Sequence, residues 1–407
     1  MTIDTTNLLD DGKKVKLARP ALLEAVQRLN DLASTSDTAK GVSLVGSAGR
    51  VVDSISALRA LPKTGSATAF VLGFYAKGDG GGGNYFLDES DTTSAETIGV
   101  VIVATDGGRW KLAKSSFITF RQFGAVGNGV TDDTASINAA FSYLRALIVK
   151  ANGVTQGESV KLLFGYPGDV FKVAGSINAT GLKGLNVVID GGGAVILGAC
   201  AGKPVFDMRN CRWYSVYNLN IWGDVTSTPS YGVTVGRTLL SGSSAGDGSF
   251  TDCAYHGYYT KACFYNFTAE TVQYRHCRFY NSYVGTGANC IVMDGVNNYN
   301  VTSEFTTQQN SADVAVSFNE NNFYGCDFRR VGSTGTDACI RYIGHGARHG
   351  YIISYAANDA GDIVEYYKPI TPHLIDLVLD IHAEVDNGTS GVRNLLLVDT
   401  ALSLIHI

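Results

Sequence analysis

The pattern of hydrophobic and polar residues in this 407-residue chain predicts one clear amphipathic helix. Between residues 131 and 150, apolar residues recur at spacings of three and four, which is the helical period. Thr131 is a suitable N-cap, and Asp132 and Asp133 would complement the helix dipole in the first turn. The apolar stripe consists of Ile137, Ala140, Phe141, Leu144, Leu147 and Ile148.

Short alternating runs bounded by Gly, Asp and Asn predict β-strands on both sides of this helix. Four runs before it predict a small β unit: Ala69–Tyr75, Gly83–Leu87, Val100–Ala104 and Arg109–Leu112. Runs after it follow one another without further helices: Val160–Phe164, Leu185–Asp190, Val195–Leu197, Val205–Met208, Tyr217–Ile221 and Tyr231–Val235. A series of short strands behind a single helix is typical of a stacked solenoid whose open end the helix closes.

A Cys-x-aromatic triplet repeats in the second half of the chain. It begins at Cys253, Cys277 and Cys326, so the intervals are 24 and 49 residues. Because 49 is about two repeats, we expect a missing member near Thr302–Phe305 and a coil of about 24 residues. Strand alternation would turn the Cys and the aromatic residue inward and the residue between them outward. The outward column on successive coils would then be Ala254, Arg278, Glu304 and Asp327.

Two segments resemble known families. FGAVGNGVTDDTASINAA, from Phe123 to Ala140, resembles the opening motif of the right-handed parallel β-helix in the pectate-lyase superfamily, in the group labelled rhamnogalacturonase/epimerase-like. Upstream, KGVSLVGSAGRVVDSISALRAL and FVLGFYAKGDGGGGNYFLDESDTTSAETIGVVIVATDGGRWKL resemble the N-terminal region of phage tailspike proteins. The resemblances imply an all-β fold, in which a single-stranded right-handed parallel β-helix is opened by a capping α-helix. A small β domain and a polar, helical N-terminal segment would precede it.

The expected organisation has three parts. Residues 1–50 would be a virion-attachment or neck segment, residues 51–117 a small β domain, and residues 118–407 the β-helix. In the first part, apolar residues at 4-3-4 spacing fit either a short trimer seam or a lone packed helix. Residues 401–407 contain no capping element, so a β-helix truncated at its C-terminus is expected. The 4-3-4 pattern is formed by Leu22, Val26, Leu29 and Ala33.

Composition narrows the function classes. The 48 Gly and 21 Tyr suit a β-rich protein with many turns, and the net charge of -5 without a basic block disfavours nucleic-acid binding. Residues 1–10 lack the basic start and apolar core of a secretory signal, and no apolar run reaches the ~18 residues that span a bilayer. With the tailspike resemblance, this pattern predicts a virion tail protein, or a prophage product in the host cytoplasm before lysis, without membrane insertion.

Cysteine and glycine patterns predict no cofactor and no metal. The eight cysteines show neither C-x-x-C nor zinc-like Cys/His spacing, and the chain lacks an export signal, so we expect buried free thiols. Residues 78–83 match G-x-G-x-x-G, but a strand follows where a dinucleotide site needs a helix, so we expect a turn. Gly344-His345-Gly346 resembles a polygalacturonase motif without its acidic partners, and we interpret His345 as a turn residue.

The outward column carries the candidate chemistry. Glu304 and Asp327 would present two carboxylates about 5 Å apart, the separation that a retaining glycosidase needs. Arg278 would bind a sugar hydroxyl or carboxylate, with His276 beside it, although stacked charges can also be purely structural pairs. Further candidates for binding substrate are Asp252, Glu270 and Tyr255. Aromatic residues that could stack on sugar rings are Trp213, Tyr214, Trp222, Tyr255, Tyr258, Tyr259, Tyr265, Tyr274 and Tyr280.

The resemblance implies a homotrimer that joins a phage tail or baseplate protein through its N-terminal region. Its β-helix would bind and depolymerise a bacterial surface polysaccharide, capsule or O-antigen. The paired carboxylates favour glycoside hydrolysis. A lyase acting on a uronic-acid-containing glycan is an alternative, with His276 as base and Arg278 as neutralising cation. A receptor-binding or structural tail protein without catalysis is the other alternative.

Overall fold

The computed structural model describes residues 24, 26–28, 50–64, 67–115, 117–149, 160–182, 187–236, 246–267, 269–285, 287–294, 318–319, 322–330, 337–343, 347–348, 351–358, 362–367, 378–384 and 396–398. The chain divides into two compact units, Met1–Lys114 and Ser115–Ile407. In the first unit, Glu24 and residues 26–28 are helical, and Val26 is buried. The other members of the predicted 4-3-4 pattern lie outside the described residues.

The first unit contains a five-stranded sheet of order β1-β2-β3-β5-β4. β1 pairs with β2 in parallel, and the other pairs are antiparallel. One face of the sheet packs against a short helix, α3 (Ile55–Arg59), whose first turn is capped by the Ser54 hydroxyl. The strands are β1 (Arg50–Val52), β2 (Thr68–Val71), β3 (Gly83–Leu87), β4 (Val101–Val103) and β5 (Arg109–Leu112).

The Gly-rich segment before β3 is a turn, as the sequence predicts. Gly78 and Gly80 have φ values of 84° and 81°, which residues with a Cβ rarely adopt. The Asp79 carboxylate accepts hydrogen bonds from the backbone N–H groups of Phe74, Tyr75, Ala76 and Gly81. No helix follows these glycines, so the segment does not have the structure of a dinucleotide site.

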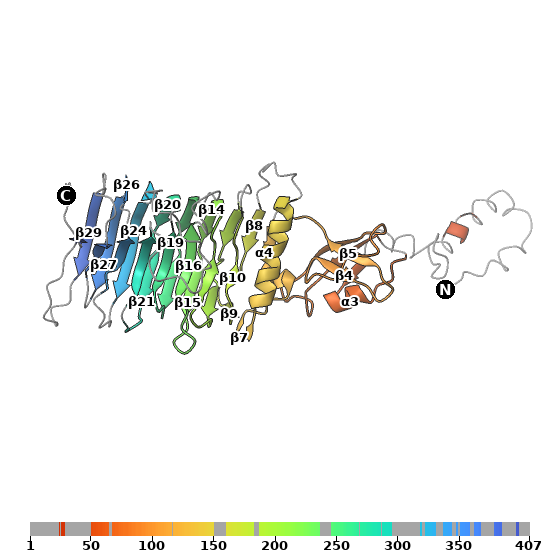
Figure 1. Cartoon of the computed structure of the whole chain (residues 1–407). Helices are drawn as coiled ribbons and strands as arrows, with labels where there is room; N and C mark the ends of the chain where they lie inside the picture. The colour runs from red at the N-terminus through yellow and green to blue at the C-terminus, as the bar shows by residue number, and fades with distance from the viewer. Residues whose placement is uncertain are drawn as a thin grey trace, which may run out of the picture. The chain divides into compact units, whose positions relative to one another are not determined.

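The second unit is a parallel β-helix, which confirms the predicted fold class (Figure 1). Each regular coil places one strand on each of three faces, and every pairing between coils is parallel. The first face contains β6 (Phe117–Thr119), β8 (Val160–Leu163), β11 (Val187–Asp190), β14 (Arg212–Tyr217), β17 (Gly246–Thr251) and β20 (Glu270–Arg275). The second face contains β7 (Asn128–Asp132), β9 (Val170–Val173), β12 (Val195–Gly198), β15 (Asn220–Gly223), β18 (Ala254–Gly257) and β21 (Arg278–Asn281).

The third face is an eight-stranded parallel sheet. Three longer strands of later coils run without interruption from the first face into the second, and join those faces into one sheet. The third face contains β10 (Ile177–Asn178), β13 (Pro204–Asp207), β16 (Tyr231–Gly236), β19 (Ala262–Phe267), β22 (Asn289–Asp294), β25 (Ile340–Ile343), β28 (Val364–Tyr367) and β30 (Leu396–Val398). The long strands are β24 (Asn322–Arg330), β27 (Tyr351–Asn358) and β29 (Val378–Glu384), and β23 (Phe318–Asn319) pairs separately with β26 (Ala347–Arg348).

The predicted helix is present as α4 (Thr134–Val149), at the start of the β-helix (Figure 1). It begins three residues later than expected, so the predicted N-cap at Thr131 is wrong. The reason is that residues 128–132 form the strand β7. The carboxylates of Asp132 and Asp133, predicted in the first helical turn, instead accept hydrogen bonds that hold the connection between β7 and α4. Asp133 accepts from the N–H groups of Val126 and Gly127, and Asp132 accepts from the hydroxyl and N–H of Thr134. The preceding 3-10 helix is η2 (Phe120–Phe123).

A sharp bend separates the first face from the second in four successive coils. The predicted strand Tyr217–Ile221 is in fact two strands, because Asn218 has a left-handed φ of 50°. Asp252 and His276 occupy the same position in later coils, with φ values of 54° and 51°, followed by Gly325 with 58°. Each of the first three donates its backbone N–H to the next coil, so the bends stack. Asn218, Asp252, His276 and Gly325 are called the bend column below.

Aromatic rings and thiols fill the interior of the coils. Tyr255, Phe279 and Phe328 are fully buried and stack coil on coil, with ring centroids 5.2 and 5.1 Å apart. Cys253, Cys277 and Cys326 form a buried column beside them, as the triplet alternation predicts. All eight cysteines are free and buried, which confirms the expectation of free thiols. Burial raises the pKa of the Cys253 and Cys277 thiols, so they are poor nucleophiles.

Candidate active site

Arg278 pairs in register with Asp327, and Ala254 pairs with Arg278. β21 and β24 pair directly as neighbours in the sheet, so the prediction of an intermediate coil near Thr302–Phe305 is wrong. The 49-residue interval is one coil with additional residues, which fall between Asp294 and Asn322. Glu304 belongs to that stretch, which is mostly outside the described residues, and its catalytic role stays a prediction.

The solvent-facing side of the second face carries two columns of side chains, because alternate residues of each strand point outward. The first column is Asn220, Ala254, Arg278 and Asp327. The second is Trp222, His256, Tyr280 and Arg329. Ionisable and aromatic side chains of three neighbouring coils are therefore brought together. We call His256, Arg278, Tyr280, Asp327 and Arg329 the second-face cluster.

Asp327 is the centre of the second-face cluster. Arg329 donates through Nε to both of its carboxylate oxygens, at 3.0 and 3.1 Å. The Tyr280 hydroxyl donates to Oδ2 of the same carboxylate. The Arg329 guanidinium also lies 5.1 Å from the centre of the Tyr280 ring, a cation–π contact. These bonds fix the orientation of the carboxylate on the outer surface.

His256 packs edge-on against the ring of Tyr280, with ring centroids 4.6 Å apart. Burial, and then the charge of Arg278, lower the pKa of His256 below its ordinary value, against the opposing effect of Asp327. Burial and the hydrogen bond to Asp327 raise the pKa of Tyr280 to about 12. Near neutral pH the cluster therefore holds an unprotonated imidazole beside a protonated phenol, which are a proton acceptor and a proton donor.

The bend column brings together two residues that the sequence selected separately. His276 Nδ1 lies 3.4 Å from Asp252 Oδ1, and both side chains are more than half exposed. The imidazole lies over the next bend residue, since a Cβ added at Gly325 would be 2.9 Å from His276 Cδ2. Asp252 and His276 thus form one exposed pair at the edge of the second face.

Two other predicted binding residues are placed differently. Tyr255 is fully buried between Phe264 and Phe279, so its predicted role in stacking on a sugar is wrong. The inward turn follows from its position two residues after the buried Cys253. Glu270 begins β20 on the first face, where its backbone pairs with Gly246. It therefore belongs to a different face from the second-face cluster.

The exposed aromatic residues are fewer than the sequence suggests. Trp213 and Trp222 have 44% and 51% of their surface exposed, and Tyr258 and Tyr280 are half-buried. Trp222 lies in the same outward column as His256 and Tyr280, and its ring is open to solvent. The buried members of the predicted set are Tyr214, Tyr255, Tyr259, Tyr265 and Tyr274.

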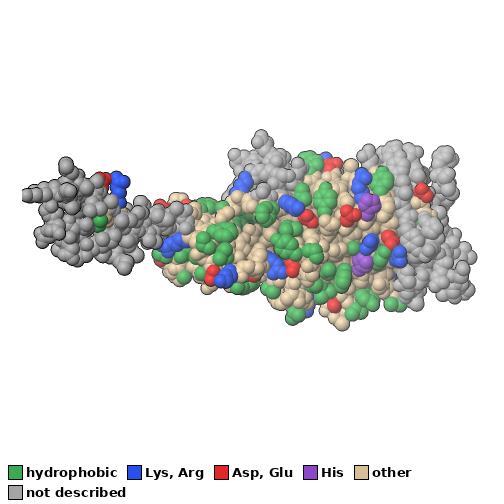
Figure 2. Space-filling model, turned by 180° about the vertical axis from the view of Figure 1, so that it is seen from behind, with side chains coloured by type: hydrophobic (Ala, Val, Ile, Leu, Met, Phe, Trp, Pro, Cys, Tyr) green, Lys and Arg blue, Asp and Glu red, His purple; other side chains and the backbone are tan. Residues whose placement is uncertain are grey.

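Sequence reasoning did not select His256 or Arg329. Each lies two positions after an outward residue of the triplet, Ala254 or Asp327, so one further step of the alternation would have found both. Figure 2 shows histidine, basic and acidic side chains gathered on one side of the β-helix. Within the described residues, no group of three His, Cys, Asp or Glu side chains is arranged to hold a metal ion. His345 lies outside the described residues.

Comparisons with known proteins agree with the phage-tail resemblance of the N-terminal part. Residues 51–115 match the family described as the phage tail protein small four-stranded beta-sheet domain. The Mu-like prophage FluMu defective tail fiber protein of Haemophilus influenzae is 30% identical over 145 residues, 35% of this chain and 22% of the relative. The chain therefore matches about a fifth of that protein's length.

Solved structures with a similar fold include phage tailspikes. The enzymatically active domain of tailspike protein 2 from bacteriophage CBA120 is 14% identical, with 93% of this chain and 59% of that chain covered and a TM-score of 0.46. The tailspike of Acinetobacter baumannii bacteriophage Fri1, a capsular polysaccharide depolymerase, is also 14% identical, with 88% of this chain and 76% of that chain covered and a TM-score of 0.43.

None of the helices in the described part of this chain is long and apolar enough to cross a membrane.

Proposed function

We propose that this chain is a phage tail component whose β-helix binds a bacterial surface polysaccharide, capsule or O-antigen, and depolymerises it. The second-face cluster carries the proposal, because it combines a proton acceptor, a proton donor and an oriented carboxylate, and the exposed Trp222 lies beside it on the neighbouring coil. The match of residues 51–115 to a phage tail domain supports the phage origin.

The second-face cluster suits two kinds of polysaccharide cleavage. In glycoside hydrolysis, Asp327 would act as one carboxylate and Glu304 as its partner. In β-elimination, neutral His256 would accept the proton next to a uronate carboxylate, Arg278 would neutralise that carboxylate, and Tyr280 would protonate the leaving oxygen. Elimination is favoured among the described residues, since Arg329 and Tyr280 already bind both oxygens of Asp327 and leave it less available as a nucleophile.

Product analysis tests the proposal directly. The purified chain would be incubated with a panel of capsular and O-antigen polysaccharides, and released oligosaccharides would be measured by size-exclusion chromatography and mass spectrometry. Elimination products contain a new double bond and absorb in the near ultraviolet, whereas hydrolysis products do not. Absorbance growing together with oligosaccharide release would establish elimination, and release without absorbance would establish hydrolysis.

A receptor-binding protein without catalysis is the second candidate. It is favoured by the hydrogen bonds that Asp327 already accepts, because these bonds make the carboxylate a weaker base and nucleophile. Glycan binding by the purified chain without any released oligosaccharide across the panel would support this candidate and overturn the depolymerase.

The N-terminal parts would provide attachment. We propose that residues 1–50 and 51–117 join the chain to a phage tail or baseplate protein, and that the working form is a homotrimer in the virion tail or, for a prophage, in the host cell before lysis. Light scattering of the full chain would then give about three times the chain mass of 43.2 kDa. A monomeric mass at micromolar concentration would contradict the trimer.

A further inference from the structure

Two arginines on either side of the bend column carry charges that no ion pair compensates. Arg275 ends β20 on the first face, and Arg278 begins β21 on the second. Both side chains are exposed. Among the described residues, neither guanidinium makes a hydrogen bond or an ion pair, although the Arg275 guanidinium lies 5.2 Å from the centre of the Tyr324 ring.

The nearby carboxylates already have partners. Asp327, which pairs in register with Arg278, is bound by Arg329 and Tyr280. Asp252 lies next to His276. Arg275 has only Thr251 and Tyr324 as its register neighbours. Among the described residues around the bend, the guanidinium groups of Arg275, Arg278 and Arg329 outnumber the carboxylates of Asp252 and Asp327, so this region is locally basic in a chain whose net charge is -5.

The positive charge of Arg278 acts electrostatically on two other residues of the second-face cluster, His256 and Tyr280. It contributes to lowering the pKa of His256, and it acts on Tyr280 in the same direction. The exposed ring of Trp222 lies one coil away from His256 in the same column. Positive charge and an aromatic surface are thus combined, and together they recognise a sugar polymer that bears anionic groups.

We propose that the ligand of this surface is an acidic polysaccharide, and that Arg275 and Arg278 bind carboxylates on neighbouring sugar residues. A guanidinium matches the planar carboxylate and can donate two parallel hydrogen bonds to it. Because the two arginines belong to different faces, they present their charges to neighbouring parts of a long ligand and not to one small anion. This inference rests on the proposed function and names the substrate class of the same site.

Matched pairs of polymers test the inference. Binding of the full chain would be measured for acidic bacterial polysaccharides and for the same polymers after chemical reduction of their carboxylates to alcohols. We expect reduction to weaken binding by about tenfold or more, and Arg275→Gln and Arg278→Gln each to weaken binding of the acidic form by about tenfold. Both variants should bind the reduced polymer as the unmodified chain does.

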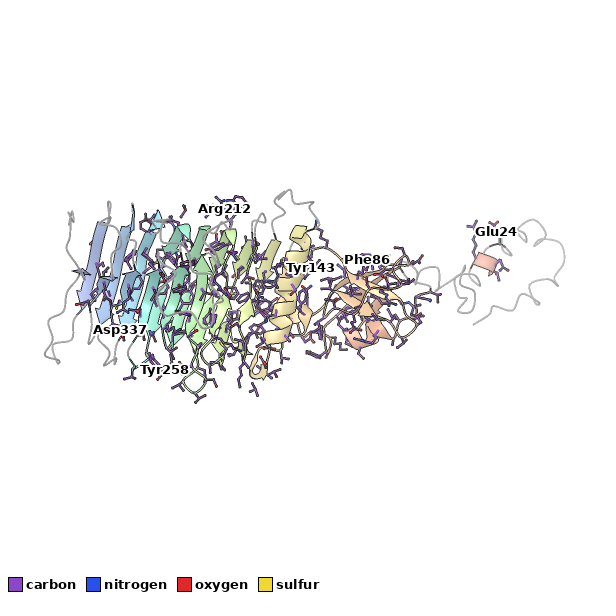
Figure 3. The ribbon with its side chains drawn as sticks, in the orientation of Figure 1. Glu24, Phe86, Tyr143, Arg212, Tyr258 and Asp337 are labelled. Atoms are coloured by element: carbon purple, nitrogen blue, oxygen red, sulfur yellow. The ribbon has the colours of Figure 1, made fainter. Side chains whose placement is uncertain are left out.

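Arg212→Gln is the matched control. Arg212 is partly exposed on the first face, but Asp247 already neutralises its charge through a bond of 2.5 Å. Figure 3 shows Arg212 and the second-face loop residue Tyr258 at opposite edges of the β-helix. This variant should bind acidic and reduced polymers with unchanged affinity.

Other outcomes would overturn the inference. Equal binding of acidic and reduced polymers would overturn it and leave the proposed function intact. An equal loss on both polymers in Arg278→Gln would show that Arg278 only positions its neighbours. Single-stranded DNA bound as tightly as the acidic glycan would show a general polyanion surface. Absence of binding to every polymer would overturn the proposed function and the inference with it. If a variant does not fold, the comparison of the two polymer forms on the unmodified chain still decides.

Discussion

Arg278 lies beside Asp327 on the neighbouring strand of the second face, although 49 residues separate them in the sequence. The two opposite charges are adjacent, yet Asp327 is bound by Arg329 from its own strand and not by Arg278. This arrangement leaves one guanidinium free for a ligand and holds one carboxylate in place.

His256 should titrate below the ordinary histidine value of 6.5, because burial and Arg278 disfavour its charged form. Arg278→Gln should move the titration upward, and Asp327→Asn should move it downward, as measured by NMR of labelled histidine. Since the unfolded chain takes up this proton first, the stability due to neutral His256 is present above pH 6.5 and is lost as the pH falls below it. Arg212→Gln should leave the titration unchanged. Shifts of the same sign in both site variants would contradict this electrostatic arrangement.

Tyr280→Phe and Asp327→Asn should each slow depolymerisation by about a hundredfold or more, because each removes a group placed to transfer or orient a proton. The measurement is the initial rate of oligosaccharide release on the best substrate of the panel. Tyr258→Phe, a change to a half-buried tyrosine in the loop after β18, is the matched control and should keep the full rate. Full activity in both site variants would remove the second-face cluster from the mechanism.

Phe279→Ala should destabilise the β-helix by about 3–5 kcal/mol, because it removes a fully buried ring from the stack between Tyr255 and Phe328. Trp222→Ala removes a larger ring that is 51% exposed, and should change the free energy of unfolding by no more than about 0.5 kcal/mol while weakening glycan binding. Denaturant unfolding and glycan binding, measured on both variants, separate the two roles. Similar stability losses would show that Trp222 is a packing residue.

Gly325→Ala should lower the free energy of unfolding more than Gly181→Ala. Both glycines have a left-handed φ, but an added Cβ meets nothing within 4 Å at Gly181, and at Gly325 it would press against the His276 ring. We expect about 1 kcal/mol for Gly181→Ala and a larger loss for Gly325→Ala. Adding His276→Ala to Gly325→Ala should remove the extra loss of stability relative to Gly181→Ala, as measured by thermal unfolding. Failure of that rescue would mean that the ring does not lie over Gly325.

The thiols should be unreactive in the folded chain. All eight cysteines are buried and unpaired, and burial raises the pKa of the Cys253 and Cys277 thiols. An aromatic disulfide reagent should titrate no thiol in buffer and eight in strong denaturant. Fewer than eight under denaturing, non-reducing conditions would reveal a disulfide.

The sequence predicts the fold well where the pattern is local. The alternation around Cys253 and Cys277 correctly orients the buried column, and the apolar stripe of α4 has buried Ile137, Phe141 and Leu144. The sequence pattern does not reveal positions whose conformation depends on backbone geometry. Asn218 looks like part of a strand, because nothing in its neighbours reveals a left-handed bend that only the stacked coils specify.

The candidate site was predictable in part. Arg278 and Asp327 are exposed or half-exposed, as the outward column requires, and the bend residues His276 and Asp252 are exposed beside them. The pairing of coils was not predictable from a period of 24, because a coil with additional residues has the same spacing as two regular coils. Tyr255 was placed among exposed aromatics by residue type, and the alternation of its own triplet gives the correct inward position.

The direct pairing of β21 with β24 shows that hydrogen bonds between coils do not depend on the length of chain that joins them. The entropy lost on closing a loop grows only with the logarithm of its length, so a coil can gain many residues at small cost in stability. The connection between β22 and β24 can thus change in length while the strands that carry Arg278 and Asp327 stay in place. Under the proposed function, the stacked strands and the residues that connect them would then evolve at separate rates as the bacterial coat changes.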